Sequence, residues 1–263
     1  MAKILVPPAG ALPRQVGLSV QFFKLTAIQQ DSNSFAVDFL LYLKWIAPEL
    51  NGAAEEAIDW DTAWHPCIKF RNQLQADLEY ERSWVHHVSE RGDAVVWKYM
   101  RWKGTFYQPF DLSAFPFDTQ NLGVVIDTAL QRHECALVRR DDVPPSFSGE
   151  QFRLVEWAFL RPQTQSSALR SPTGLEFTQF TLNLPVRRHA RWYLFNVFLI
   201  VFCMVVLAML AFFVPHDDLS GRMSITLTMV LTLTGFKFVI MDRCPRVPYL
   251  CILDKHLLLA MLV

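Results

Sequence analysis

Hydroxyl side chains recur at every fourth position in an apolar stretch near the end of the sequence. Ser224, Thr228 and Thr232 follow one another at this interval, and a helix places residues four apart on one face. If several copies of such a helix turned this face inward, the hydroxyls could replace water around an inorganic ion. Alternatively, they could bond to carbonyls of their own helix, as we expect for Thr226 and Thr234 on other faces. The spacing alone leaves both interpretations open.

Catalytic chemistry has little support in the sequence. It contains no GxSxG nucleophile elbow, no HExxH metal pair and no glycine-rich phosphate loop. His65 and Cys67 are potential metal ligands but form an isolated pair. His86 and His87 are adjacent, so a strand would point their rings to opposite faces. We therefore predict neither an enzyme nor a metal or cofactor site.

Composition divides the chain into two parts. Of its 263 residues 52% are hydrophobic and the formal net charge is +0, a balance that argues against a general nucleic-acid binder. The stretch Trp192–Val214 contains no Asp, Glu, Lys or Arg, and a helix of that length crosses the hydrocarbon core of a bilayer. A second helix is predicted over about 222–241 and the start of a third from about 249. The sequence therefore predicts a membrane protein in contact with lipid.

The first part of the chain has the period of β-strands. From Phe35 to Trp45 the apolar residues occupy alternate positions, which places one set of side chains against a core. The stretches Val95–Phe106, Phe152–Leu160 and Leu175–Leu184 are similar, and only Asn51–Trp60 offers a brief helical alternative. The predicted fold is an all-β, antiparallel, immunoglobulin-like sandwich over residues 1–190, followed by an α-helical transmembrane bundle over residues 191–263. Seven tryptophans are expected by default in the sandwich core: Trp45, Trp60, Trp64, Trp84, Trp97, Trp102 and Trp157.

Two motifs carry a family resemblance. The stretch Asp111–Gln120, which includes Phe-Pro-Phe-Asp, resembles a loop of the pentameric ligand-gated ion channels, also called Cys-loop receptors. Pro245–Leu250 resembles the link between the second and third membrane helices of that family. Further landmarks occur in the family's order: Trp45, Trp64-His65-Pro66 and Asn196-Val197. The resemblance implies one subunit of a homo- or heteropentamer in the plasma membrane, with its N-terminal domain outside and its ligand between neighbouring sandwiches.

Some positions depart from the family pattern. Gln108 and Leu122 occupy the places of the signature disulfide, which brings the chain nearer to the bacterial and cysteine-less branches. Ile200 stands near the place of a usual proline. The sequence ends at Val263 within the third helix, whereas the family has four. We therefore expect either a fragment or a truncated, non-conducting subunit that binds or assembles with partners.

The resemblance also implies a coupling layer where the sandwich meets the membrane. Its members lie in two loops, before the first membrane helix and in the link after the second: Asp31, Phe115, Pro116, Phe117, Asp118, Arg188, Pro245, Arg246 and Pro248. We expect an ion pair between Asp118 and Arg188, which would cost about 3–5 kcal/mol to break from one side if partly buried. Solvation of both residues at the level of the lipid headgroups is the alternative.

A pore face follows from the same resemblance. Its residues are Ser224, Thr228, Leu231, Gly235, Phe238 and Asp242. Leu231 is the expected hydrophobic gate, because a ring of leucines can exclude water. Carboxylates of Asp217, Asp218 and Asp242 favour cations, whereas Arg222 would favour anions if it pointed into the lumen.

The ligand is weakly indicated. Arg71, Ala129 and Leu40 occupy positions of the family's aromatic box, and Arg161 begins a predicted capping loop over residues 161–174. An aromatic cage for an amine is therefore not evident. The two arginines could receive a carboxylate. Protons are the other candidate agonist, through His65, His86, His87 and His133.

Overall fold

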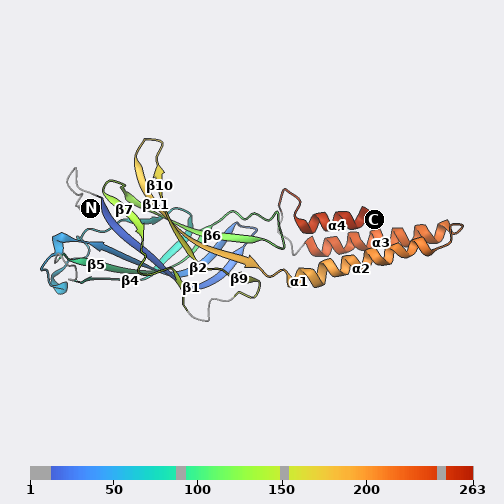
Figure 1. Ribbon diagram of the computed structural model, residues 1–263, viewed down its shortest axis with the longest axis horizontal. Coiled ribbons are helices and arrows are strands. Elements are labelled where there is room, and N and C mark those ends of the chain that lie inside the picture. The colour runs from blue at the N-terminus through green and yellow to red at the C-terminus, as the bar shows by residue number, and fades with distance from the viewer. Residues whose placement is uncertain (1–12, 87–92, 149–153, 242–246, 263) are drawn as a thin grey trace.

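Strands and helices occupy opposite ends of the elongated molecule (Figure 1). The computed structural model describes residues 13–86, 93–148, 154–241 and 247–262. Within them, every strand lies before residue 189 and the helices of spanning length come after residue 190. This arrangement confirms the predicted fold class.

Two sheets form the β-sandwich. The first contains β1 (Arg14–Gln29), β2 (Ser34–Ile46), β4 (Gln73–His86), β5 (Val95–Tyr107), β7 (Cys135–Arg139) and β8 (Ser146–Phe147). Its order is β4-β5-β2-β1-β7, with β8 also beside β1. The second contains β3 (Ile68–Phe70), β6 (Thr119–Gln131), β9 (Trp157–Phe159), β10 (Gln163–Arg170) and β11 (Glu176–Arg188). Its order is β10-β11-β6-β3, with β9 also beside β11. Neighbouring strands are antiparallel, except that β7 and β8 run parallel to β1.

The alternation of apolar residues predicted the bounds of some strands better than those of others. The strands β2 and β5 coincide with predicted alternation, and β11 continues four residues beyond the predicted end at Leu184. The predicted strand over 152–160 contains only the short β9, and residues 152 and 153 lie outside the described part. Between residues 51 and 60 the structure has one 3₁₀ turn, η2 (Glu55–Ala57), after another, η1 (Pro48–Leu50).

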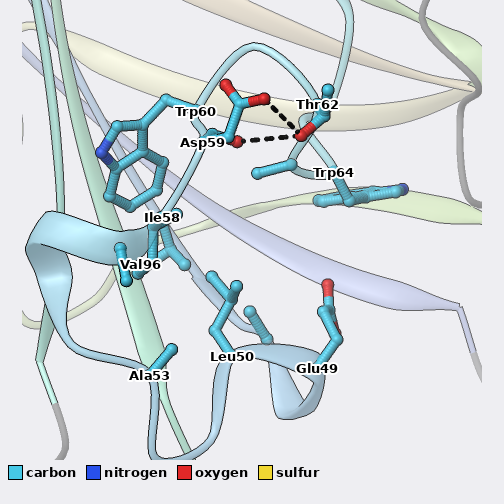
Figure 2. A pocket seen from close by; sticks show the side chains of 12 residues that line it. Glu49, Leu50, Ala53, Ile58, Asp59, Trp60, Thr62, Trp64 and Val96 are labelled. Carbon is cyan, nitrogen blue, oxygen red and sulfur yellow. Dashed lines mark hydrogen bonds between the residues drawn. The ribbon is translucent and has the colours of Figure 1, made fainter.

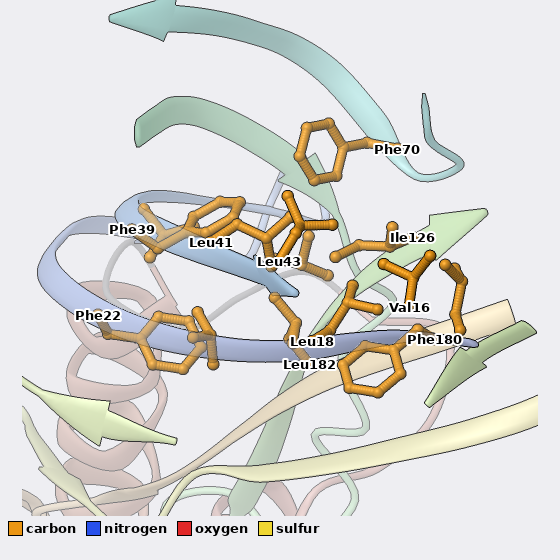
Figure 3. Packing of buried hydrophobic residues seen from close by; sticks show 14 of the residues in the cluster. Val16, Leu18, Phe22, Phe39, Leu41, Leu43, Phe70, Ile126, Phe180 and Leu182 are labelled. Atoms are coloured by element: carbon orange, nitrogen blue, oxygen red, sulfur yellow. The ribbon is translucent and has the colours of Figure 1, made fainter. Parts of the chain in front are cut away.

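The core lies between the two sheets (Figure 3). Leu41 and Leu43 of β2 are fully buried, and they face Phe180 and Leu182 of β11 across the sandwich. Burying each such side chain contributes about 1.5–3 kcal/mol. This interior holds the strands in the register that positions their loops.

The prediction that all seven tryptophans lie in the sandwich core was wrong for two of them. Trp45, Trp64 and Trp157 are buried, while Trp60 and Trp102 are partly buried against the core. Trp84 and Trp97 instead lie half-buried on the outward face of the first sheet, because they share the register of polar residues.

The membrane part begins three residues after β11. Its first helical segment comprises α1 (Arg191–Tyr193), the π-helical turn η3 (Leu194–Phe198), α2 (Leu199–Ala208) and the 3₁₀ turn η4 (Met209–Phe213). Within it, the Asn196 side chain donates to the carbonyl of Trp192 at 2.9 Å. The helix α3 (Leu219–Met241) begins three residues earlier than predicted, and α4 (Ile252–Leu262) follows it. Residues 191–213 and 219–241 each form 23 helical residues long and apolar enough to cross a membrane.

Candidate functional site

The predicted ion pair between Asp118 and Arg188 is present in the structure. Arg188 Nε donates to Asp118 Oδ1 at 2.7 Å and Nη2 donates to Oδ2 at 3.3 Å. The register of β6 and β11 explains this contact, because Thr119 lies opposite Arg187 and the next residues therefore meet at the edge of the sheet. The backbone amide of Arg188 also donates to the carbonyl of Asp118 at 3.2 Å.

Both side chains of this pair are removed from water. Their exposed fractions are 1% for Asp118 and 4% for Arg188. The guanidinium lies 4.2 Å from the ring centroid of Trp157 and 4.8 Å from that of Phe115, which are favourable positions for a cation over an aromatic face. Solvation at the headgroup level is therefore not the state that the structure describes.

Further polar contacts complete the surroundings of the pair. Gln120 Nε2 donates to Asp118 Oδ2 at 2.8 Å and to the carbonyl of Asp111 at 2.7 Å. With its amide oriented to match its surroundings, the oxygen of Gln30 accepts from Nη1 of Arg188 at 3.1 Å and also from Nη2. The guanidinium thereby joins the end of β1 to the loop before β6.

The loop over residues 111–118 rests directly on the membrane helices. The amide of Leu112 donates to Tyr249 Oη at 2.8 Å, and the amide of Leu253 donates to the carbonyl of Phe115 at 3.3 Å. The ring of Phe115 also meets that of Tyr193 edge-on at 5.0 Å. Contacts thus run from the loop to the first membrane segment and to the start of α4.

Two further members of the predicted coupling layer differ in exposure. Pro116 is buried, whereas Phe117 is 44% exposed and its ring centroid lies 5.9 Å from that of Phe198 in η3. At the base of the same loop, hydrogen bonds from Ser113 hold the pKa of Asp111 below its usual range.

Two other predicted coupling residues, Asp31 and Pro248, are less closely engaged. Asp31 is exposed in the turn between β1 and β2, and Pro248 is exposed before α4. The turn itself contacts the segment between β5 and the loop through Asn33, whose carbonyl accepts from the amide of Gln108 at 2.8 Å. Pro245 and Arg246 lie outside the described residues.

A side-chain amide joins the strand segments that carry the signature disulfide in the family pattern. Gln108 Oε1 accepts from the backbone amide of Gly123 at 3.1 Å, while Leu122 is fully buried in the core. Four cysteines, Cys67, Cys135, Cys203 and Cys251, are free thiols in the described part of the chain.

The predicted pore residues share an uncovered face of α3. Ser224, Thr228 and Gly235 are exposed, as are Leu231 (74%) and Phe238 (67%). The opposite side of α3 packs against the other helices through residues such as Leu233 and Ile240. Asp242 lies outside the described residues.

The threonine hydroxyls on α3 bond to carbonyls of their own helix. Thr226 and Thr234 do so as predicted. Thr228 and Thr232 do the same, each donating at 2.7 Å to the carbonyl four residues earlier. Their oxygens nevertheless keep lone pairs on the exposed side, so this bonding does not remove them as acceptors.

Charged groups at the start of α3 point in different directions. Asp218 Oδ1 accepts from the amide of Gly221 at 2.9 Å, which satisfies one of the free amides at the helix start. Arg222 donates through Nε and Nη2 to the carbonyl of Val214, at 3.1 and 2.8 Å. Its guanidinium is thus held on the turn between the two membrane segments, while Asp217 and Asp218 remain exposed.

The four predicted ligand residues do not form one cluster within a single chain. Arg71 lies 3.7 Å from Asp127 of β6, and Ala129 is exposed farther along the same strand. Leu40 belongs to the other sheet. The strand β10 occupies most of the predicted capping loop and forms a hairpin with β11. Arg161 lies at the base of that hairpin, two residues before β10.

An aromatic cluster on the outward face of the first sheet was missed from the sequence. Trp84 stacks on Trp97 with centroids 6.3 Å apart, and Tyr99 meets Trp84 at 4.3 Å. Arg140 lies 4.6 Å above Trp97, and its own side chain is 3% exposed. One sequence signal could have found this cluster. Residues 97 and 99 alternate in step with the polar residues Arg101 and Lys103, which places all four on the same outward face of β5.

Among the candidate proton acceptors, His65 has a perturbed environment. Burial lowers its pKa, and nearby Lys98 lowers it further. Its Nδ1 lies 3.5 Å from Cys67 Sγ, and burial raises the pKa of that thiol. His87 lies outside the described residues.

The structure is thus a β-sandwich followed by helices, two of which are long and apolar enough to cross a membrane. No family model matches the chain. Curated relatives include a gamma-aminobutyric acid receptor subunit beta-like of Drosophila melanogaster, 23% identical over 97% of this chain and 55% of the relative. The human gamma-aminobutyric acid receptor subunit rho-3 is 23% identical over 95% of this chain and 56% of the relative. The human neuronal acetylcholine receptor subunit alpha-10 is 26% identical over 84% and 48%.

These relatives confirm the family resemblance: the chain is homologous to subunits of the Cys-loop ligand-gated ion channels. They are receptor subunits rather than enzymes, in keeping with the predicted class. The chain spans about half the length of the curated relatives it matches. Its nearness to the bacterial branch stays a prediction.

Proposed function

We propose that this chain is one subunit of a pentameric ligand-gated ion channel of the plasma membrane, with its sandwich domain outside. Agonist binding between adjacent sandwiches opens a pore lined by α3. The agonist is a small molecule or a proton, and the pentamer contains like subunits, of one kind or several. The observation that carries the proposal is the run of contacts from Arg188, through the loop 111–118, to α4.

This contact path supports transmission of a movement from the sandwich to the helices. Arg188 ends β11 and lies three residues before α1, so a displacement of that strand acts directly on the first membrane segment. The loop paired to Arg188 also contacts Leu253 and Tyr249, which follow the pore helix. A shift of the two sheets therefore acts on the first membrane segment, before α3, and on the start of α4, after it.

The exposed face of α3 supports the assignment of the pore. Ser224, Thr228 and Gly235 offer polar atoms or open space, and Leu231 supplies the hydrophobic constriction between them. A single helix cannot enclose an aqueous path, so this role requires several copies around one axis. Lipid then covers the apolar residues on the outside of the assembly.

Charge placement favours cations. The carboxylates of Asp217 and Asp218 remain exposed at the start of α3, whereas the guanidinium of Arg222 is retained on Val214. Five copies would give rings of carboxylates at one mouth of the pore. Reversal potentials in asymmetric sodium and chloride solutions test this proposal, and a reversal that follows the chloride gradient refutes it.

The proposal of a pore is tested by recording from cells that express the chain, with any downstream sequence, as wild type and as Leu231→Ser. A hydroxyl at the gate hydrates the constriction, so we expect a constitutive leak or activation at lower agonist concentration. Val230→Ser is the matched control: Val230 is also exposed but is rotated by about 100° on the helix. Surface pentamers in which both variants are silent would support a non-conducting subunit instead. Equal leaks from both would contradict the assigned pore face.

A further inference from the structure

The connection from β2 to β3 lies at the end of the sandwich away from the membrane helices (Figure 1). A separate pocket is formed there (Figure 2). The connection from β2 to β3 folds around it, with Val96 of β5 as a further wall. Its volume is about 410 Å³, within the range of about 300–1,000 Å³ that is typical of small-molecule sites. A single chain forms this pocket, so ligand binding there requires no neighbouring subunit.

Most of the lining is apolar or aromatic. Leu50, Ile58 and Ala53 surround the space, and Trp60 and Trp64 bring their indoles to it from opposite sides (Figure 2). Such a surface accepts the apolar body of a ligand. The sign of the ligand's charge is therefore selected by the few polar groups at the rim of the pocket.

The segment 47–64 itself carries acidic charge only, although Arg14 of β1 pairs with its Glu49. Glu49 and Asp59 line the pocket. The segment 47–64 contains five acidic residues, with Glu55, Glu56 and Asp61 besides these two, and no Lys or Arg. A low-dielectric wall with several carboxylates raises the local concentration of cations and repels anions. The charge thereby disfavours a carboxylate or phosphate ligand.

One indole of the pocket already carries a cation from the protein. The Arg14 guanidinium lies 4.3 Å from the ring centroid of Trp64 and donates to Glu49 at 2.7 and 3.0 Å. Over Trp60, by contrast, no Lys or Arg of the described residues is stacked. Asp59, beside Trp60, is exposed and accepts hydrogen bonds from Thr62.

We propose that this pocket binds a small organic cation, such as a quaternary ammonium with an apolar body. The charged group lies over Trp60, by analogy with Arg14 over Trp64, and Asp59, the neighbour of Trp60 in the chain, also lines the pocket. The apolar body contacts Leu50, Ile58 and Ala53. The site is independent of the proposed agonist site between subunits. A metal ion is a poorer occupant, because no group of three metal-ligating side chains occurs among the described residues.

The test compares two probes of matched shape by calorimetry on the full chain in detergent. Choline carries a quaternary ammonium, and 3,3-dimethylbutan-1-ol replaces its nitrogen with carbon. We expect choline to bind about tenfold more tightly, the preference that a cation over an indole provides. A neutral isostere that binds equally well would overturn the proposal.

Variants then locate the binding site. Trp60→Leu is expected to weaken choline binding about tenfold and to reduce the preference over the neutral probe. Ala53→Leu fills the pocket without changing any charge, and it should abolish binding while leaving the thermal unfolding midpoint nearly unchanged. Trp84→Leu, in the aromatic cluster on the outward face, is the control and should have no effect. Retained binding in folded Ala53→Leu, or loss in Trp84→Leu alone, would refute this location.

Discussion

Replacing Asp118 with alanine removes one partner of an ion pair whose other partner has little access to water. Arg188 is 4% exposed and is enclosed by the rings of Phe115 and Trp157. In the variant, its buried charge keeps only the carbonyl of Gln30 as a described side-chain acceptor. The free energy of unfolding should therefore fall by about 3–5 kcal/mol.

The assay is thermal unfolding of the full chain in detergent, followed by tryptophan fluorescence, since Trp157 contacts the guanidinium. For a domain of this size the expected loss corresponds to a fall in midpoint on the order of 6–20 °C. Asp118→Asn is the matched control, because it keeps the shape and an acceptor oxygen. It should cost less than Asp118→Ala.

A double variant separates the cost of an unpaired charge from the value of the pair. Asp118→Leu combined with Arg188→Met removes both charges, and such replacements of buried pairs are often neutral or stabilising. We expect the double variant to regain most of the midpoint that Asp118→Ala loses. In recordings, Asp118→Ala should impair gating and leave ligand binding largely intact. A fall in midpoint below about 2 °C, or reduced surface assembly with normal gating, would refute this reasoning.

Three further predictions follow from local contacts. Tyr249→Phe removes the acceptor of the Leu112 amide and should lower the free energy of unfolding by about 0.5–1.5 kcal/mol, measurable by denaturant titration; an unchanged midpoint would contradict that bond. Burial lowers the pKa of His65, so the unfolded chain takes up its proton first and stability falls as the pH drops below about 6.5. His65→Gln should flatten this part of the stability–pH profile, and an identical profile would argue against the contribution of His65. Burial raises the pKa of Cys135 to about 12, so at pH 8 this thiol should resist alkylation, by mass spectrometry, until the chain is unfolded.

The sequence predicted those features that a local period determines. Alternation located β2 within one residue at each end, and the uncharged stretch located the first long apolar helical segment equally closely. Both depend only on neighbouring residues and on the solvent that each face meets. The period of two also assigns side chains to one of two faces, but it does not state which face is covered. The core expectation for Trp84 and Trp97 therefore failed.

The pairing of Asp118 with Arg188 depended on a different kind of information. Asp118 and Arg188 are 70 residues apart, and no local pattern indicates that two exposed-looking charges will be buried together. Family resemblance supplied that pairing, and the register of β6 with β11 explains it. The pocket beneath Trp60 gave no comparable signal. Its lining comes from an irregular connection in which alanines and tryptophans follow no fixed period.

The loop between Gln108 and Gly123 is closed by a hydrogen bond in place of a disulfide, so its closure does not depend on the redox potential of its surroundings. A disulfide closing a loop of about 15 residues would stabilise the fold by about 3 kcal/mol, mainly by restricting the unfolded chain. An amide contact restricts only the folded state and is worth about 0.5–1.5 kcal/mol. The loop can consequently form in oxidising or reducing surroundings alike. The hydrogen bond between Gly123 and Gln108 can also break and re-form as the loop moves, whereas a disulfide would have to be reduced first.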